Sequence, residues 1–533
     1  MTELAAGRVL GADGWYDPAE QRLRGSRCGT CGTRSFPTRA FCWRCSNTML
    51  PELLPRSGTV VARSTVRVSA PGFPDRYDVG VVELAPGLRV LARFEDEAPT
   101  HGERVSVRTG HVRHEDSGVV LGPVFAHDPG AALLPATHHE DAALPQPEAR
   151  ISRGGQLGVT VAGVATTAFG RPDRAAEELA AEAALAAVAD AGLRHEDVDA
   201  LVVGSAFSTA ALGQRMLRHV PWGGRRIVNV ENACASGTSA LAEAVALVRA
   251  GLADVVVAVG ADVPVRSGGG LIPLDQEDPV AGIGVTLPSL YALVGDLYTS
   301  RYGVGSEAFA SVVVHSRDNA FRNPDAYRRT PVTREEVLGS RAIADPLTLF
   351  QCAPNADGAA AVVVVADHVV RRSEHRPVEI AALALTSGFA KDRFTGASVV
   401  ERVSRAVYAQ AGVDPSEIGV VELHDAFAPA ALTNLEYLGL ADPGTAGTRL
   451  MAGEFGISGG GPSLNPSGGL LSRGHPPGAT GLAQVSELVR QLRGEAGERQ
   501  VDDPGVALLH TMGGTVLELE TNACTIGLLR RRP

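Results

Sequence analysis

Residues Gly237–Arg249 read GTSALAEAVALVR, and residues Gly478–Arg490 repeat this pattern as GATGLAQVSELVR, displaced by 241 positions. A second pair of segments occurs in the same order. Residues Ala191–Ala206 read AGLRHEDVDALVVGSA, and residues Ala411–Ala426 read AGVDPSEIGVVELHDA, displaced by 220 positions. Two matches in one order indicate an internal duplication. Because strand-like and helix-like segments alternate in both copies, the sequence predicts two α/β halves that share one topology.

The duplication pairs a cysteine with a histidine. Adding the displacement of 241 to Cys234 gives His475, so the two residues lie just before equivalent helices. Cys234 follows the strand-like segment VNV and precedes a helical run, where unpaired N–H groups and the helix dipole favour a thiolate. An imidazole beside such a thiol is the usual general base. The alternative for Cys234 is a small buried core cysteine.

Four blocks of the sequence carry a family resemblance: NACASGTSALAEA (232–244), HDAFAPAALTNLEYLGL (424–440), NPSGGLLSRGHPPGATGLAQ (465–484) and HTMGGT (510–515). In order and spacing they resemble the signature blocks of thiolases, and they are most similar to the sterol-carrier-protein X type. The resemblance covers Leu157 to Leu529. It implies an α/β protein with a duplicated five-layered thiolase fold, built from two βαβαβαββ halves, and a homodimer through this unit.

The resemblance also implies roles for individual residues. Cys234 would accept the acyl group, and His475 would deprotonate its thiol. His424 would stabilise the oxyanion of the thioester carbonyl, directly or through water, and the backbone N–H groups around Gly513 and Gly514 would form a second oxyanion site. For His424 the alternative is a structural histidine that bonds its own turn.

The sequence departs from the family where reversible thiolases carry a second cysteine. That cysteine lies in a C-terminal Cys-x-Gly or in HDCF, whereas this chain has Met512-Gly513-Gly514 and HDAF with Ala426. The remaining Cys-His-His set is typical of decarboxylating condensing enzymes and thiolase-like C-acyltransferases. We therefore expect an acyltransferase that loads an acyl group from a coenzyme A or acyl-carrier-protein thioester onto Cys234 and passes it to a carbon nucleophile.

Two other function classes remain open. A retro-aldol carbon–carbon lyase would split a side-chain acyl-CoA without an acyl-enzyme, and such thiolase-like proteins tend to have tyrosine at the position of His424. A catalytically degenerate lipid-binding or scaffold protein would bind acyl-CoA without turnover. Retention of Cys234, His424 and His475 together favours the transferase, because a binding shell has no need of a nucleophile beside an imidazole.

Four of the seven cysteines crowd into eighteen positions near the N-terminus. Cys28, Cys31, Cys42 and Cys45 have the spacing C-x2-C-x10-C-x2-C, which is typical of a closed, structural zinc site. Iron in a rubredoxin-like site is the lesser alternative.

The pattern along the chain predicts five units. They are a zinc ribbon with an N-terminal helix (1–50), an OB-fold barrel (51–126), a linker (127–154), and thiolase-like N-terminal (155–372) and C-terminal (373–533) halves. The ribbon and barrel resemble the zinc-ribbon plus OB-fold domain that accompanies thiolase-like proteins. We expect this domain to dock on the thiolase unit and shape acyl or coenzyme A access.

Composition narrows the class of partner. The formal charge of −11 argues against a nucleic-acid partner. The longest apolar runs, such as Ala253–Gly260 (ADVVVAVG), are too short to cross a bilayer, and the first residues have no signal pattern. We therefore expect a cytoplasmic protein with no membrane partner.

Overall fold

The structure is a computed structural model that describes residues 8–12, 14–42, 44–115, 118–132, 158–208, 210–271, 279–369, 375–388, 398–514 and 521–532. Most of the predicted linker 127–154 lies outside these residues. In the part of the chain that the structure describes, no helix combines the length and the apolar character needed to span a membrane.

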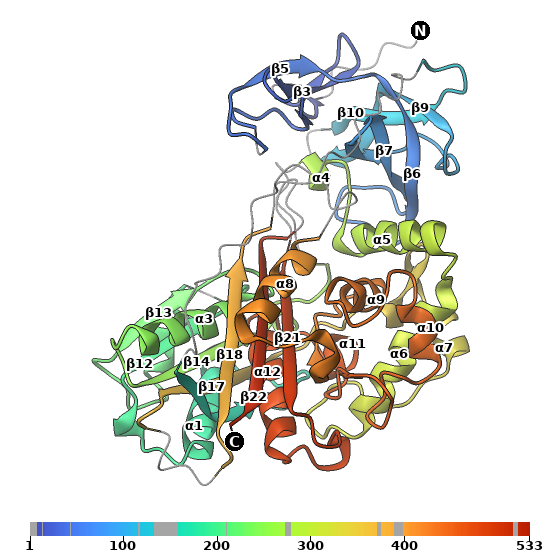
Figure 1. Ribbon diagram of the computed structural model, residues 1–533. Coiled ribbons are helices and arrows are strands. Elements are labelled where there is room, and N and C mark those ends of the chain that lie inside the picture. The colour runs from blue at the N-terminus through green and yellow to red at the C-terminus, as the bar shows by residue number, and fades with distance from the viewer. Residues whose placement is uncertain are drawn as a thin grey trace.

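The predicted duplication is visible in one ten-stranded sheet, whose strand order is β13-β12-β14-β17-β11-β18-β22-β21-β19-β20 (Figure 1). The first half contains β11 (Val159–Thr166), α1 (Ala176–Asp190), β12 (Ala200–Gly204), α2 (Leu212–Met216), β13 (Arg226–Val230), α3 (Ser236–Arg249), β14 (Val255–Asp262) and β17 (Gly358–Ala366). The second half contains β18 (Val378–Thr386), α8 (Val399–Ala411), β19 (Ile418–Glu422), α9 (Ala428–Tyr437), α10 (Ala446–Met451), β20 (Ser463–Leu464), α11 (Gly469–Arg473), α12 (Pro477–Arg493), β21 (Val506–Gly513) and β22 (Ala523–Arg531).

Strand pairing is the same in the two halves. In the first half β12 runs parallel to both β13 and β14, and β17 runs antiparallel to β14 and β11. In the second half β19 runs parallel to β20 and β21, and β22 runs antiparallel to β21 and β18. The halves join where β11 pairs with β18, with Thr160 opposite Glu379. Each strand therefore has a counterpart, as the repeat predicts.

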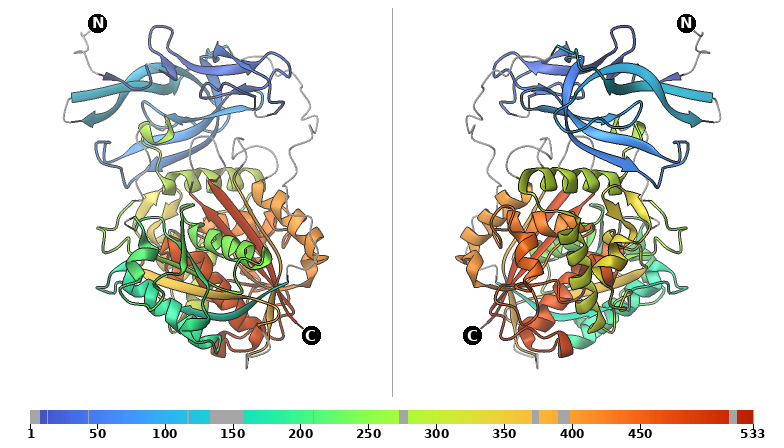
Figure 2. Two further views of the ribbon diagram at one scale, coloured as in Figure 1. Left: turned by 90° about the vertical axis from the view of Figure 1, so that its left-hand side faces the viewer. Right: turned by 90° about the vertical axis from the view of Figure 1, so that its right-hand side faces the viewer.

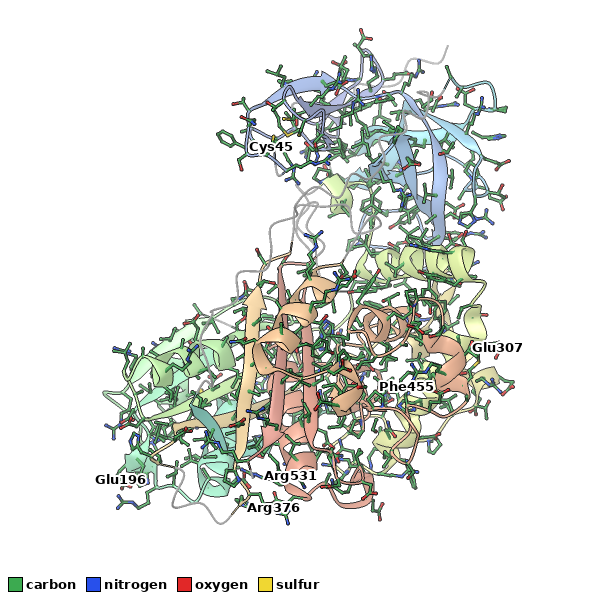
Figure 3. The ribbon with its side chains drawn as sticks, in the orientation of Figure 1. Cys45, Glu196, Glu307, Arg376, Phe455 and Arg531 are labelled. Carbon is green, nitrogen blue, oxygen red and sulfur yellow. The ribbon has the colours of Figure 1, made fainter. Side chains whose placement is uncertain are left out.

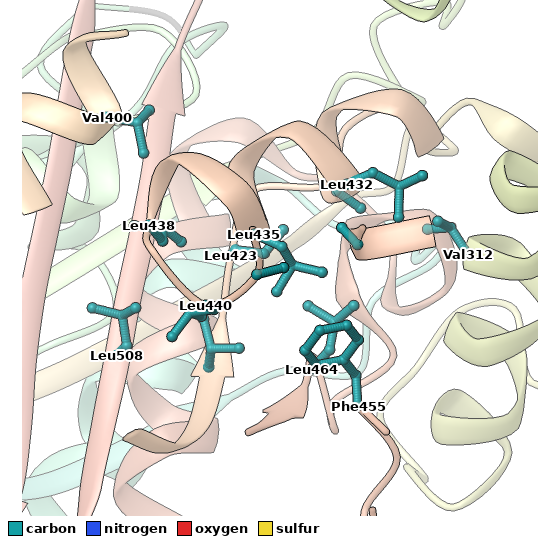
Figure 4. Packing of buried hydrophobic residues seen from close by; sticks show 14 of the residues in the cluster. Val312, Val400, Leu423, Leu432, Leu435, Leu438, Leu440, Phe455, Leu464 and Leu508 are labelled. Carbon is teal, nitrogen blue, oxygen red and sulfur yellow. The ribbon is translucent and has the colours of Figure 1, made fainter. Parts of the chain in front are cut away.

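Helices α3 and α12 pack on each other between the two half-sheets and share one apolar core with strands of both. On the outer faces, α1 covers the first half-sheet and α8 and α9 cover the second (Figures 1 and 4). Strands β14 and β17 are buried on both faces, which explains their near-continuous Val and Ala runs. This arrangement confirms the predicted five-layered α/β fold.

The N-terminal barrel has five antiparallel strands in the order β8-β7-β6-β9-β10. They are β6 (Ser57–Val66), β7 (Tyr77–Ala85), β8 (Leu88–Arg93), β9 (Arg104–Glu115) and β10 (Gly118–His127). Phe94 directly follows β8, and Phe125 lies in β10. A backbone bridge between these two residues joins the first and last strands and closes the ring. The barrel is compatible with the predicted OB type.

The ribbon is built from β2 (Tyr16–Asp17), β3 (Arg22–Cys28), β4 (Arg34–Ser35) and β5 (Met49–Leu53). The helix predicted within residues 1–50 is absent from the described residues 8–12, 14–42 and 44–50, which form strands and turns. Strand β1 (Arg8–Val9) instead pairs in parallel with β10. The physical reason is apolar burial, since Leu10 packs into the barrel core beside Val120.

The barrel shares structure with the thiolase unit. The long connection from β14 to β17 holds α4 (Pro279–Gly282), α5 (Leu287–Tyr302), α6 (Ser306–Phe321), α7 (Arg334–Leu338), β15 (Ala342–Ala344) and β16 (Leu347–Thr348). Strand β15 pairs with β6 of the barrel, with Ala344 opposite Val66. Ile283 and Leu290 enter the barrel core, and α5 lies directly beneath the barrel (Figure 2).

Polar contacts join the same surfaces. The Tyr77 hydroxyl donates to the carbonyl of Gly284 at 2.5 Å, and the backbone N–H of Arg63 donates to Asp296 Oδ2 at 2.9 Å. The predicted docking of the N-terminal domain on the thiolase unit is thus present as one shared sheet and one shared core.

Candidate active site

Three loops bring Cys234, His424 and His475 together. Cys234 lies between β13 and α3, His424 between β19 and α9, and His475 between α11 and α12. One side-chain ligand atom from each of these residues lies within 4.8 Å of the other two, and all three residues are buried. The sequence had predicted this group from two different arguments, the repeat for His475 and the family resemblance for His424.

Glycines allow the two halves to approach closely enough for this contact. A Cβ on Gly237 of α3 would lie 2.4 Å from the carbonyl oxygen of Gly478 in α12, and a Cβ on Gly260 of β14 would lie only 1.9 Å from it. Any larger residue would force the helices apart. Because Cys234 and His475 immediately precede these helices, the glycine contact sets their separation.

The hydrogen bonds of His475 fix its tautomer. Its Nε2 lies 3.2 Å from Cys234 Sγ, and its Nδ1 lies 2.7 Å from Thr480 Oγ1. The Thr480 hydroxyl also lies 2.9 Å from the carbonyl of Pro476, which can only accept, so both contacts are hydrogen bonds when Thr480 donates to Pro476 and accepts from His475. His475 therefore carries its proton on Nδ1 and presents the Nε2 lone pair to the thiol.

Cys234 is a neutral thiol in this structure. Burial raises the pKa of Cys234 to about 12, although the Gly514 N–H and the N–H of Cys234 itself lower it. Burial also lowers the pKa of His475, with further contributions from His424 and Arg473. The helix N-terminus favours a thiolate, but burial acts in the opposite direction and is the largest effect on the pKa of Cys234.

His424 is neutral as well. Burial lowers the pKa of His424 to about 3, and its ring stands nearly perpendicular to that of His475, with centroids 5.4 Å apart. Asn434 holds the turn by donating to the His424 carbonyl at 3.2 Å, but among the described residues the Nδ1 atom of His424 has no hydrogen-bond partner. The alternative of a ring that bonds its own turn through Nδ1 is therefore not what this structure contains.

The C-terminal glycines lie beside Cys234. A Cβ on Gly513 would lie 2.1 Å from the Asn232 carbonyl oxygen, and Gly514 adopts a φ of +53°. Both features restrict these positions to glycine. The N–H of Gly514 hydrogen-bonds the sulfur of Cys234, so a backbone donor faces the thiol.

Two polar residues beside the site were missed by the sequence analysis. His510, in β21, is fully buried, and its Nδ1 accepts the backbone N–H of His424 at 3.4 Å. Asp262, at the end of β14, accepts the Gly478 N–H at 2.6 Å and so ties the first turn of α12 to the other half. The only signal for His510 was its place as the first residue of the HTMGGT block.

No second cysteine joins this cluster within the described residues. Cys352 is half-buried beside the HDAF turn, but its thiol donates to the carbonyl of Thr348 at 3.5 Å, and burial raises its pKa to about 12. Cys524 is buried in β22. This chain has Ala426 where HDCF has its cysteine, and neither Cys352 nor Cys524 takes the place of that thiol in the cluster.

The four cysteines of the ribbon form a compact site, which lies near Cys45 in Figure 3. Sulfur–sulfur distances are 3.4 Å for Cys28–Cys45 and 3.6 Å for both Cys31–Cys42 and Cys31–Cys45. A tetrahedral Zn–S₄ centre with bonds of about 2.3 Å needs separations of about 3.8 Å. The residues fit zinc with no open position, and the role of the ion is structural.

One surface groove lies away from these centres. It has a volume of about 720 Å³, and its lining includes Arg376, Asp503 and Arg531, two of which are labelled in Figure 3. None of Cys234, His424 and His475 lines this groove.

Fold and site together define a duplicated α/β protein with a buried thiol–imidazole centre. Residues 159–368 match the family model described as "Thiolase, N-terminal domain", and residues 386–523 match "Thiolase C-terminal domain-like". Residues 15–49 match "ChsH2, rubredoxin-like zinc ribbon domain".

Curated relatives cover the same region. The acetyl-CoA acetyltransferase of Methanothermobacter thermautotrophicus is 37% identical over 370 residues, which are 67% of this chain and 96% of that protein. Human sterol carrier protein 2 is 35% identical over 381 residues, 67% of this chain and 70% of that protein. The benzoylsuccinyl-CoA thiolase subunit BbsB of Thauera aromatica is 34% identical over 365 residues, 67% of this chain and 94% of that protein. The chain belongs to the thiolase family.

Solved structures agree with this assignment. The Ltp2-ChsH2(DUF35) aldolase has a TM-score of 0.62 and 30% identity, covering 70% of this chain and 98% of that chain. Human mitochondrial 3-ketoacyl-CoA thiolase has a TM-score of 0.54 at 16% identity, covering 70% of this chain and 99% of that chain, and it supports the fold alone.

Proposed function

We propose that the protein is a thiolase-like C-acyltransferase or condensing enzyme that acts on acyl thioesters of coenzyme A or an acyl-carrier protein. The observation that carries this proposal is the 3.2 Å contact between Cys234 Sγ and the unprotonated Nε2 of His475. A nucleophile and a correctly oriented base in direct contact are what acyl-enzyme formation requires. Curated relatives with acetyltransferase and thiolase in their names support the same reaction class.

In the first half-reaction the sulfur of Cys234 attacks the thioester carbonyl carbon while its proton moves to His475 Nε2. The carbonyl oxygen becomes an oxyanion, which accepts hydrogen bonds from the Gly514 N–H and from His424. The intermediate collapses by breaking the bond to the coenzyme A sulfur. The proton on His475 passes to that leaving thiolate, so a free thiol departs and a thioester remains on Cys234.

In the second half-reaction a carbon nucleophile attacks the acyl-enzyme. With Ala426 in HDAF and Met512 in the C-terminal block, the site offers no thiol to remove a proton from an acetyl-CoA methyl group. The acceptor is therefore a malonyl-type substrate, which forms its carbanion by losing carbon dioxide, or a carbon that is already electron-rich. When the new carbon–carbon bond forms, the Cys–acyl bond breaks and Cys234 leaves as a thiolate. His475 Nε2 takes up a proton, from water in the decarboxylating case or from the acceptor carbon otherwise, and passes it to the sulfur to restore the neutral thiol.

Intact-protein mass spectrometry tests the covalent step. Incubation with a panel of acyl-CoA donors is expected to add one acyl mass to the wild type and none to Cys234→Ala. Cys352→Ala serves as a matched control and is expected to be acylated like the wild type. Equal acylation of the wild type and Cys234→Ala, or no acylation of either across the panel, would contradict the proposal.

A carbon–carbon lyase is the second candidate, and one observation favours it. The aldolase structure with a TM-score of 0.62 combines, by its title, an Ltp2 protein with a ChsH2(DUF35) protein, and this chain joins a thiolase unit to a ChsH2-type ribbon. A lyase mechanism without an acyl-enzyme assigns no catalytic role to Cys234. Cleavage of a β-hydroxyacyl-CoA that survives Cys234→Ser would establish this alternative.

We further propose that the protein is a cytoplasmic homodimer. Strand β13 ends the ten-stranded sheet and is partly exposed, so its edge is open to pairing with a second copy. Light scattering coupled to gel filtration measures the mass. A monomer at micromolar concentration would contradict the dimer.

A further inference from the structure

Three buried histidines lie at the site, but the proposed chemistry assigns a task to only two of them. His510 is 0% exposed, and its Nε2 is among the buried side-chain atoms that lack a hydrogen-bond partner within the described residues. A buried N–H without an acceptor costs about 1–3 kcal/mol. Such an atom beside a catalytic group calls for a function.

We propose that His510 is a positioning residue that fixes the tautomer of His424, so that His424 presents an N–H to the thioester oxygen. The significance of this tautomer rests on the proposed acyl transfer, but the tautomer itself is a property of the free protein. His510 is not itself in contact with the reacting atoms. It acts through His424.

The first step of the argument concerns His510. Its Nδ1 accepts the backbone N–H of His424 at 3.4 Å, so Nδ1 carries the lone pair. Burial and the nearby His424 lower the pKa of His510 to about 3, which keeps the ring neutral. A neutral imidazole with an unprotonated Nδ1 carries its proton on Nε2. His510 is therefore a donor at the atom that lacks a partner.

The second step concerns His424. Its Nδ1 is likewise buried without a partner among the described residues. The two unpartnered nitrogens belong to neighbouring rings, and one of them is an N–H. No direct hydrogen bond joins these two nitrogens in the structure, but one water that accepts from His510 Nε2 and donates to His424 Nδ1 satisfies both atoms. His424 Nδ1 is then the acceptor, and the proton of His424 lies on Nε2.

As a consequence, the two neutral histidines His475 and His424 have different roles, one as a proton acceptor and the other as a hydrogen-bond donor. Thr480 holds the proton of His475 on Nδ1, so that His475 Nε2 can accept the thiol proton. His510 holds the proton of His424 on Nε2, so that this nitrogen can donate to the oxyanion. The opposite tautomer of His424 would turn a lone pair toward a developing negative charge. His475 thus acts as the base and His424 as the hydrogen-bond donor, although both are histidines.

Two substitutions at His510 separate this role from a merely structural one. His510→Asn can keep an acceptor near the Nδ1 position for the His424 backbone N–H, but it has no distal donor. His510→Gln places an amide N–H near the Nε2 position and keeps the distal donor. A structural role through the backbone contact predicts that Asn is the better replacement, whereas the tautomer role predicts that Gln is.

Two reactions of Cys234 give the kinetic readout. Acylation by acetyl-CoA passes through an oxyanion, whereas alkylation by iodoacetamide does not. We expect His510→Asn to slow acylation by at least about tenfold, within the 10²–10³ range seen for loss of one oxyanion donor, and to leave alkylation within about twofold of the wild type. His510→Gln is expected to recover most of the acylation rate. Equal acylation by the wild type and His510→Asn overturns the proposal.

The tautomer can also be read without any acyl chemistry. Nitrogen-15 spectra of histidine-labelled protein distinguish protonated from unprotonated ring nitrogens, and His424→Asn identifies the His424 signals by their loss. We expect a protonated Nε2 on His424 in the wild type and a mixture of tautomers in His510→Asn. A wild-type His424 protonated on Nδ1 overturns the proposal even if the protein accepts no acyl-CoA. Absence of acylation alongside the expected spectra counts against the proposed function and leaves the tautomer assignment standing.

Discussion

Replacing Thr480 by valine tests whether the tautomer of His475 controls the reactivity of Cys234. Valine has nearly the shape of threonine, but it lacks the hydroxyl that accepts from His475 Nδ1 at 2.7 Å. The ring is buried, so no solvent replaces the lost acceptor. In Thr480→Val the tautomer with a proton on Nε2 becomes the better one, and it turns an N–H instead of a lone pair toward the thiol.

The magnitude follows from the cost of an unpaired buried donor. Keeping the reactive tautomer without its acceptor costs about 1–3 kcal/mol, which corresponds to a rate about 5-fold to 150-fold slower. The thiol cannot compensate by ionising alone, because burial raises the pKa of Cys234 to about 12. We therefore expect deprotonation of Cys234 to slow by this factor, with little change in its accessibility.

The assay is the rate of alkylation of Cys234 by iodoacetamide, followed on the Cys234 peptide so that the ribbon cysteines do not contribute. Thr480→Ser is the matched control, because it keeps the hydroxyl that bridges His475 and the Pro476 carbonyl. We expect the serine variant to react within about threefold of the wild type. Wild-type reactivity in Thr480→Val would refute the tautomer argument. An equal loss in both variants would assign the effect to packing.

Four further outcomes follow from the structure. Gly260→Ala is expected to lower the free energy of unfolding by about 3 kcal/mol or more in a denaturant titration, because its Cβ would lie 1.9 Å from the Gly478 oxygen, whereas Gly223→Ala, with no heavy atom nearby, should change little. Ala426→Cys restores the thiol of HDCF and is expected to raise deuterium exchange at the α-carbon of acetyl-CoA by about tenfold; no gain would show that a cysteine at this position is not sufficient. Because burial raises the pKa of Cys234 to about 12, the neutral thiol should persist as pH rises. The difference in thiolate absorbance between the wild type and Cys234→Ser should therefore stay flat from about pH 6 to about pH 9. A step in this difference within that window would contradict the neutral thiol. Metal analysis should find one zinc per chain, lost in Cys31→Ser while Cys234 alkylation is retained; an unchanged zinc content would place the metal elsewhere.

The sequence was sufficient for the parts of the site that depend on local pattern. The displacement between Cys234 and His475 predicted their contact, because a duplicated fold places equivalent helix starts beside a pseudo-dyad. The spacing of the four ribbon cysteines likewise predicted that they form one cluster, which the structure contains.

What the sequence did not predict depends on pairing between distant segments. His510 gains its importance only from the position of the His424 backbone N–H, 86 residues away along the chain. The helix N-terminus favours a thiolate, whereas the opposing effect of burial on the pKa of Cys234 depends on all the surrounding elements and not on the helix alone. Likewise, Val66 of the barrel pairs with Ala344, and no local pattern marks either residue as part of one sheet.

The shared sheet and core change how the N-terminal barrel should be regarded. One part of α5 contributes Leu290 and Leu293 to the barrel core, while Tyr291 stacks on Phe427 of the HDAF turn with ring centroids 4.5 Å apart. Phe427 follows His424 by three residues, so the helix that seals the barrel also packs against the turn that carries His424. Separating the barrel would expose apolar residues of α5 and remove support from this turn. The barrel is therefore part of the structure that holds the active site, and the fusion of the two units in one chain keeps that support permanently in place.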